Sequence, residues 1–147
     1  MKVFGVFVLA FIIMFLGCGE GKLKIEGSKE LFNKVPGLYD VFKEYWSCRA
    51  KLDADNAFKF EAPHIQFMIR KKAYRAYINW FGKATLQAIE PYKVECEKDF
   101  YCCVDMKMDF VIKKDKKHDI REGRDCWIKV GGKWWHVMRN PLLFLGI

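Results

Sequence analysis

The sequence predicts an α+β protein in which helices come first and the strands of an antiparallel sheet follow. Apolar residues from Leu38 to Leu52 recur at steps of three and four, which places them on one face of a helix. From Ala84 onward apolar and polar residues alternate, most regularly over Cys102 to Ile112, as in a strand with one buried face. The change of period along the chain therefore separates a helical half from a sheet half.

Three helical segments are predicted in the first half. They run from Leu38 to about Asp53, from Asp55 to Phe60, and from Ile65 to Phe81 with a break near Arg70. The first begins after Gly37, and Asp40 and Glu44 lie in its early turns, where the helix dipole favours acidic residues. The second must end before Pro63, because the residue ahead of a proline resists the α-helical region.

Four strands are predicted in the second half: Leu86 to Glu95, Cys102 to Ile112, Ile120 to Val130 and Lys133 to Met138. The charged run 113–117 is expected to be a solvated hairpin loop. Gly131 and Gly132 are typical of a two-residue hairpin turn in which both residues have positive φ. Counting outward from this turn pairs Val130 with Lys133, Lys129 with Trp134, Ile128 with Trp135, and Trp127 with His136.

This register divides the closing hairpin into two faces. One is apolar and is expected to be core; it carries Cys126, Ile128, Trp135 and Val137. The other is a candidate binding or interface face, because a solvated face does not need two tryptophans; it carries Trp127, Trp134 and His136. Three interpretations of the second face stay open: the apolar tail Pro141 to Ile147 covers it, it forms a dimer contact, or it lines a ligand cleft.

The chain opens with Lys2 and an apolar run from Val3 to Leu16. This run has about 14 residues, whereas a helix needs about 20 to cross a bilayer, so it predicts a removable secretory leader. With Gly17 and Cys18 the segment resembles a bacterial lipoprotein signal peptide. The resemblance implies cleavage before Cys18 and attachment of lipid to its sulfur. The alternative is a plain secretory leader that contains a cysteine.

This interpretation divides the chain into a signal peptide (1–17), a lipid tether and linker (18–37) and a single domain (38–147). The membrane is then a partner through the N-terminal lipid, and the protein belongs to the cell envelope. Gly19 lacks the aspartate that signals retention at the inner membrane in the lipoproteins it resembles. We therefore expect the outer membrane or the cell surface.

Composition and charge limit the class of protein. Hydrophobic residues make up 52% of the chain and aromatic residues 16%, which is too apolar for a disordered protein. The formal net charge of +8 would be compatible with binding to nucleic acid. An exported protein is expected to meet anionic lipid head groups or cell-wall polymers instead, so no nucleic-acid partner is predicted.

The six cysteines bear on redox state. Lipid on Cys18 leaves five, and an oxidising envelope favours pairing. Cys96 and Cys102 flank a short loop, so a hairpin could join them in a disulfide, whereas Cys102 and Cys103 point to opposite faces of a strand. Two alternatives stay open: a metal site formed by these cysteines with His118, although their spacing matches no paired metal motif, and buried free thiols.

The arrangement also resembles the nuclear-transport-factor-2-like family. The resemblance is carried by Val41 to Trp46, by Asp53-Ala54-Asp55 and by the hairpin from Trp127 to Val137. It implies helices packed in the concave face of a bent antiparallel sheet, forming a cone with an open mouth. The candidate lining residues of such a cavity are Met106, Met108, Phe110 and Trp135.

That family contains enzymes, such as ketosteroid isomerase and scytalone dehydratase, and non-catalytic binding modules. Isomerase chemistry needs a carboxylate base inside the cone, and the inward face of Cys102 to Ile112 has no acid. We therefore predict no catalytic residue, no cofactor and no metal. The expected function is an envelope lipoprotein that binds a small apolar ligand, an envelope protein or a second copy of itself. The alternative is an isomerase- or dehydratase-like enzyme with its base among His136, Asp53 and Asp55.

Overall fold

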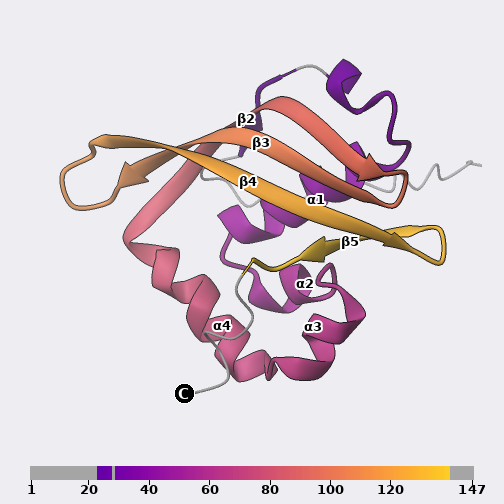
Figure 1. The fold of residues 1–147 in the computed structure, drawn as a ribbon. Helices are drawn as coiled ribbons and strands as arrows, with labels where there is room; N and C mark the ends of the chain where they lie inside the picture. The colour runs from indigo at the N-terminus through magenta and orange to yellow at the C-terminus, as the bar shows by residue number, and fades with distance from the viewer. Residues whose placement is uncertain (1–22, 28, 140–147) are drawn as a thin grey trace, which may run out of the picture.

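The computed structural model describes residues 23–27 and 29–139, in which a five-stranded sheet curls around helices (Figure 1). The α+β class is confirmed. The helices are α1 (Leu38–Ala50), α2 (Ala54–Phe58), α3 (Pro63–Met68) and α4 (Lys71–Trp80), with 3₁₀ turns η1 (Lys29–Phe32) and η2 (Phe81–Lys83). The strands are β1 (Lys24–Ile25), β2 (Ala84–Lys98), β3 (Tyr101–Ile112), β4 (His118–Val130) and β5 (Lys133–Val137).

The helix boundaries follow local signals. Asp53 caps α2, where its side chain accepts a hydrogen bond from the Asn56 backbone N–H at 3.2 Å. Pro63 is the first residue of α3, a position where its missing N–H is not needed. The expected break near Arg70 separates α3 from α4, because Ile69 and Arg70 have extended backbone. Within the described residues, no helix has the length and apolar character to cross a membrane.

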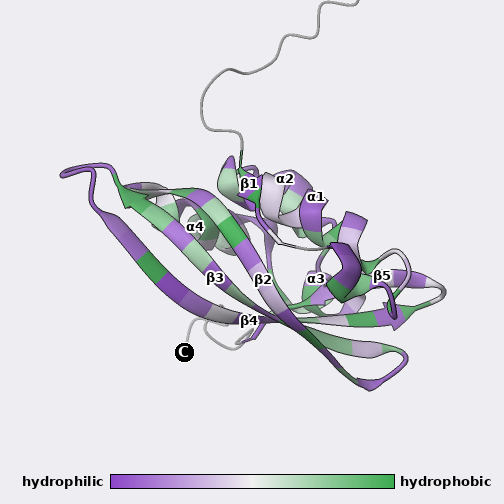
Figure 2. Ribbon diagram, turned by 90° about the horizontal axis from the view of Figure 1, so that it is seen from above, coloured by the Kyte–Doolittle hydropathy of each residue, from purple (hydrophilic) through white to green (hydrophobic). Residues whose placement is uncertain are grey.

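The sheet has the order β1-β2-β3-β4-β5, and the last four strands are antiparallel neighbours. The predicted register of the closing hairpin is confirmed, from Val130 opposite Lys133 to Trp127 opposite His136. Both turn glycines have positive φ, 59° at Gly131 and 77° at Gly132. Figure 2 shows apolar and polar residues interleaved along β2 and β3, as in strands with one buried face, whereas β4 is mostly hydrophilic.

The folded region starts before residue 38, which corrects the expected linker 18–37. Strand β1 pairs in parallel with β2 at Ala88 and Ile89. Phe32 and Val35 are buried in the core, and the Phe32 ring lies 5.7 Å from that of Phe42. These residues carry no helical or alternating pattern of their own, and they are held by the sheet edge and by α1. The signal peptide and Cys18 lie outside the described residues.

The faces of the closing hairpin are opposite to those expected. Trp127 is 0% exposed and Trp134 3%, whereas Ile128, Trp135 and Val137 are only half-buried. The physical reason is α1, which packs on the face that carries Trp127 and Trp134. Its Phe42 and Tyr45 rings lie 6.2 and 5.5 Å from the ring of Trp127, and the Trp134 indole N–H donates to the Pro36 carbonyl at 3.1 Å.

The face of Trp127 and Trp134 is therefore core and offers no open interface. This removes the basis for a dimer or partner contact there. Helix α1 is what covers it. The tail Pro141 to Ile147, suggested as its cover, lies outside the described residues.

Two disulfides join β3 to both of its neighbours. Cys96 on β2 is bonded to Cys102, and Cys103 is bonded to Cys126 on β4. The adjacent cysteines of β3 thus point to opposite faces and are not bonded to each other. These bonds leave no thiolate for the suggested metal site, and the described residues contain no cluster of metal-binding side chains. Cys48 is the free thiol of the described residues, and burial raises its pKa.

Candidate functional site

Three charged side chains are buried in the core of the described region. Glu61 is 0% exposed, His136 5% and Asp125 7%. Glu61 lies in the turn between α2 and α3, and that turn is bonded to β5. The Ala62 N–H donates to the His136 carbonyl at 2.8 Å, and the His136 N–H donates to the Phe60 carbonyl at 2.7 Å. These backbone bonds bring Glu61 beside His136.

His136 lies between two carboxylates. Its Nδ1 is 2.7 Å from Oε2 of Glu61, and its Nε2 is 2.6 Å from Oδ1 of Asp125. Burial of the imidazole tends to lower its pKa, but the carboxylates of Asp125 and Glu61 outweigh burial and raise the pKa of His136 to about 10. The ring is therefore an imidazolium at neutral pH and donates from both nitrogens.

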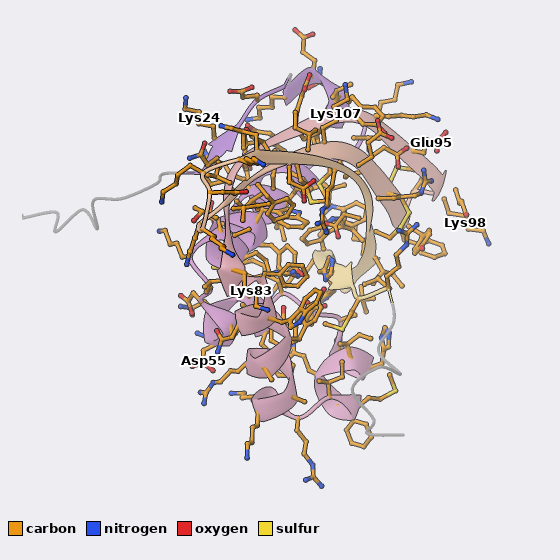
Figure 3. All side chains as sticks on the ribbon, turned by 90° about the vertical axis from the view of Figure 1, so that its left-hand side faces the viewer. Lys24, Asp55, Lys83, Glu95, Lys98 and Lys107 are labelled. Atoms are coloured by element: carbon orange, nitrogen blue, oxygen red, sulfur yellow. A yellow bond between two sulfur atoms is a disulfide. The ribbon has the colours of Figure 1, made fainter. Side chains whose placement is uncertain are left out.

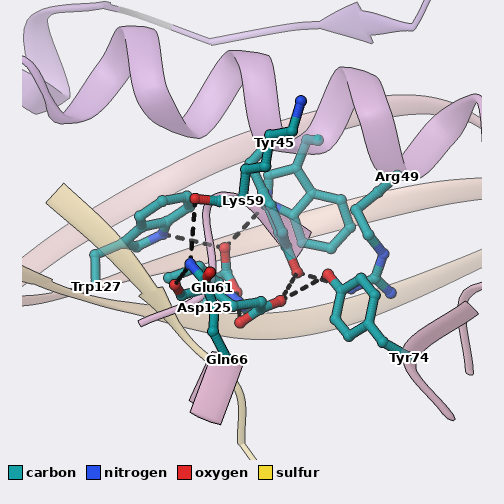
Figure 4. A network of polar contacts seen from close by, with 10 residues as sticks. Tyr45, Arg49, Lys59, Glu61, Gln66, Tyr74, Asp125 and Trp127 are labelled. Carbon is teal, nitrogen blue, oxygen red and sulfur yellow. Dashed lines mark hydrogen bonds and ion pairs between the residues drawn. The ribbon is translucent and has the colours of Figure 1, made fainter. Parts of the chain in front are cut away.

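Aromatic side chains occupy the remaining carboxylate oxygens (Figure 4). The hydroxyls of Tyr45 and Tyr74 donate to Oε1 of Glu61 at 3.2 and 2.7 Å. The indole N–H groups of Trp46 and Trp127 donate to Oδ2 of Asp125 at 3.0 and 3.1 Å. Burial raises the pKa of both tyrosines, so they are neutral donors. Every carboxylate oxygen in this network has a donor.

This saturation limits the chemistry of the network. His136 has no free nitrogen to take a proton from a substrate, because both ring nitrogens bind carboxylates. Asp53 caps α2, and Asp55 forms an ion pair with Arg75 at 2.8 Å on the surface. None of the three suggested bases therefore presents a free basic atom to a cavity.

A cavity of about 570 Å³ lies between the concave face of the sheet and helices α1 and α4. Figure 3 shows the sheet bending around interior side chains, while Glu95 and Lys107 point outward. Of the four suggested lining residues, Met106, Met108 and Phe110 line it. Trp135 does not line it. The Nζ of Lys133 instead lies 4.2 Å from the centroid of the Trp135 ring.

Other walls of the cavity are also largely apolar. They include Leu52, Ile78, Trp80, Phe81, Leu86 and Ile112. His136 and Asp125 reach the cavity from the network. Arg49, in the last turn of α1, is a further charged member of the lining. Charged residues of β4, such as Arg121 and Glu122, contribute as well.

Sequence reasoning did not single out Glu61, Asp125 or Arg49. Asp125 had a usable signal, because it lies two residues from Trp127 on one strand and must share its face. Glu61 lies in a turn with no periodic pattern, and only the fold brings it to His136. In the sequence Arg49 is one basic residue among many. Only the folded structure places the rings of Tyr77 on α4 and Phe81 in η2 beside it.

Comparisons with known proteins bear on the fold. A scan against models of protein families found no match, and neither did a search of curated protein sequences. Among solved structures, the chain is similar to a SEC-C motif containing protein from Rhodopseudomonas palustris, with a TM-score of 0.56 and 15% identity over 71% of this chain and 77% of that chain. A SEC-C motif containing protein from Psychrobacter arcticus gives a TM-score of 0.56 and 13% identity over 71% and 60%. At such identities the likeness concerns the fold and assigns no activity.

Proposed function

We propose that this protein is an exported, lipid-anchored binding protein whose α+β domain holds a small apolar ligand in the cavity without catalysing a reaction. The cavity carries the proposal. Its volume of about 570 Å³ lies within the range of about 300–1,000 Å³ typical of small-ligand sites. The accessible surface of its walls is mainly apolar, as in most such sites, and it also includes charged side chains, the majority of them from β4.

The geometry of the network supports binding over catalysis. An acid–base catalyst must offer an atom that can exchange a proton with the ligand. The imidazolium of His136 is held at both nitrogens, and the oxygens of Glu61 and Asp125 accept bonds from protein donors. The resemblance to the nuclear-transport-factor-2-like family agrees with this proposal, because that family includes non-catalytic binding modules.

Export is supported by two independent features. The leader and Cys18 resemble a lipoprotein signal peptide, and the folded domain contains two disulfides. Disulfides persist in oxidising compartments such as the periplasm and the cell surface, and they are rare in the cytosol. Lipid on Cys18 would hold the domain at a membrane.

Replacing Cys18 by alanine is expected to release the protein from the membrane fraction, because the sulfur that receives lipid is lost. Cell fractionation followed by immunoblotting measures this. The matched control is Cys48→Ala, which removes the free thiol of the domain and should leave the protein at the membrane. Membrane partitioning of Cys18→Ala equal to that of the control would refute lipidation.

Filling the cavity is expected to weaken ligand binding. Ala84 lines the cavity, so Ala84→Phe places a ring in the cavity without removing a large side chain. We expect an uncharged fluorescent probe such as Nile red to bind at least about tenfold more weakly. The control is Thr85→Phe, at the neighbouring residue of β2 that does not line the cavity. Equal binding by both variants would contradict the cavity as the site.

A further inference from the structure

We infer that the ligand of this cavity carries an anionic head group, a carboxylate or a phosphate, which binds the guanidinium of Arg49. The inference rests on the proposed function and adds the chemical class of the ligand. Arg49 lines the cavity from the C-terminal turn of α1. Among the described residues, no carboxylate lies within ion-pair distance of it.

Three other arginines of the domain are paired with carboxylates. Arg75 is 2.8 Å from Asp55, and Arg121 is 2.7 Å from Asp119. Arg124 is 3.1 Å from Glu95 and 2.9 Å from Asp105. Arg121 and Arg124 also line the cavity, but each of them is already paired with a carboxylate. Arg49 is a partly buried cation that faces a cavity and lacks such a partner.

Aromatic rings hold the guanidinium of Arg49 in place. Its Cζ lies over four rings, at 5.7 Å from the centroid of Tyr45, 5.4 Å from Trp46, 5.0 Å from Tyr77 and 5.3 Å from Phe81. Such contacts stabilise a cation without using its N–H groups. They also fix the plane of the guanidinium, which prepares it for binding two oxygens of one anion.

The hydrogen bonds of Arg49 leave donors for a ligand. One terminal nitrogen donates to the Tyr45 hydroxyl at 2.8 Å, and a guanidinium has five N–H donors in all. Tyr45 in turn donates to Glu61, so its hydroxyl stands between Arg49 and the buried network. Arg49 therefore has no direct ion pair with Glu61. Its other donors are available to an anion that enters the cavity.

The other residues that line the cavity indicate the chemistry of the rest of the ligand. Met106, Met108 and Phe110 form the apolar wall of the cavity on β3. Methionine side chains are flexible and adapt to apolar groups of different shape. A molecule that suits both Arg49 and this wall has one anionic head and an apolar body. A fatty acid and an alkyl phosphate share this chemistry.

The test compares three ligands with the same alkyl chain: decanoate, decyl phosphate and decanol. Each displaces Nile red from the full chain, below its critical micelle concentration. We expect at least one anion to bind about tenfold or more tightly than decanol. A hydrogen bond between charged groups is stronger than one to a neutral group by an energy that corresponds to about this ratio of dissociation constants. The anion that binds more tightly identifies the head group as carboxylate or phosphate.

Variants then assign the preference to Arg49. Arg49→Gln should bind both anions as weakly as it binds decanol, while Arg49→Lys keeps part of the preference. The matched control is Lys83→Gln, which removes an exposed cation at the rim of the same cavity and should keep the full preference. Thermal unfolding of each variant checks that the domain is folded.

The outcomes separate this inference from the proposed function. If none of the three ligands displaces the probe, the proposed function fails. If decanol binds the wild-type protein as tightly as both anions, the cavity binds ligands but the inference is wrong, and this result needs no variant. An equal loss of preference in Lys83→Gln and Arg49→Gln would also overturn it, because it would assign the preference to general positive charge.

Discussion

Replacing His136 by leucine should destabilise the domain by about 3–5 kcal/mol, because it leaves two buried carboxylates without their cation. Glu61 and Asp125 would each lose a hydrogen bond, of 2.7 and 2.6 Å. Natural domains unfold at a cost of about 5–15 kcal/mol, so the variant would be close to unfolding. Urea unfolding followed by tryptophan fluorescence measures the change.

The matched control is His118→Leu. His118 also pairs with a carboxylate, Asp109, at 2.8 Å, but its side chain is 59% exposed. Loss of an exposed pair is expected to cost about 0–1 kcal/mol. A loss for His136→Leu no larger than that for His118→Leu would show that the buried histidine is not the counter-ion of the network.

The same histidine predicts how stability depends on pH. Its pKa is about 10 in the folded protein against an ordinary value of 6.5. A group whose pKa is raised by folding stabilises the protein fully below its unfolded pKa, and the stabilisation is lost as pH rises through the folded pKa. Stability should therefore fall between these two values in the wild-type protein. His136→Leu should lack this fall.

Reduction of the disulfides is the second large expected effect. Cys103 and Cys126 are 23 residues apart, and Cys96 and Cys102 are 6 apart. If a disulfide acts by restricting the unfolded chain, the longer loop is worth about 3 kcal/mol and the shorter about 2 kcal/mol. Reducing both bonds would then remove a large part of the stability of an ordinary domain.

Two variants separate the bonds. A protein with Cys96→Ala and Cys102→Ala keeps only the long-range bond, and one with Cys103→Ala and Cys126→Ala keeps only the short-range bond. For each variant, the difference in unfolding free energy with and without reductant isolates one bond, because the side chains are otherwise the same. The account predicts the larger difference for the Cys103–Cys126 bond. Stabilities that do not respond to reductant would mean that these cysteines are not bonded in the folded protein.

Local patterns predicted most of the elements, and long-range packing decided the rest. The alternation over β3 and the turn at Gly131 and Gly132 fixed strands and register, because those signals lie within a few residues of each other. The choice of inner face on β4 and β5 was wrong. Both faces carry tryptophan, and only the position of α1 shows that Trp127 lies inside.

The candidate site was predicted only in part. Three of the four suggested lining residues belong to one strand, where alternation places them together. The ion network joins groups 75 and 11 residues apart in sequence, and no local pattern reports such a contact. The four aromatic rings around Arg49 likewise come from different elements, α1, α4 and η2. Charged residues are rarely buried in a protein core. The sequence therefore gave no reason to expect Glu61, Asp125 or Arg49 in the interior.

The most direct test of the central claim is a titration of decanoate into protein with ¹³C-labelled methionine methyl groups, followed by NMR. Met106 and Met108 line the cavity, whereas Met68 on α3 is 39% exposed and lies outside it. If the cavity is the ligand site, the signals of Met106 and Met108 shift and saturate with decanoate while that of Met68 stays in place. A shift confined to Met68, or no saturable shift of any methionine, would contradict the account.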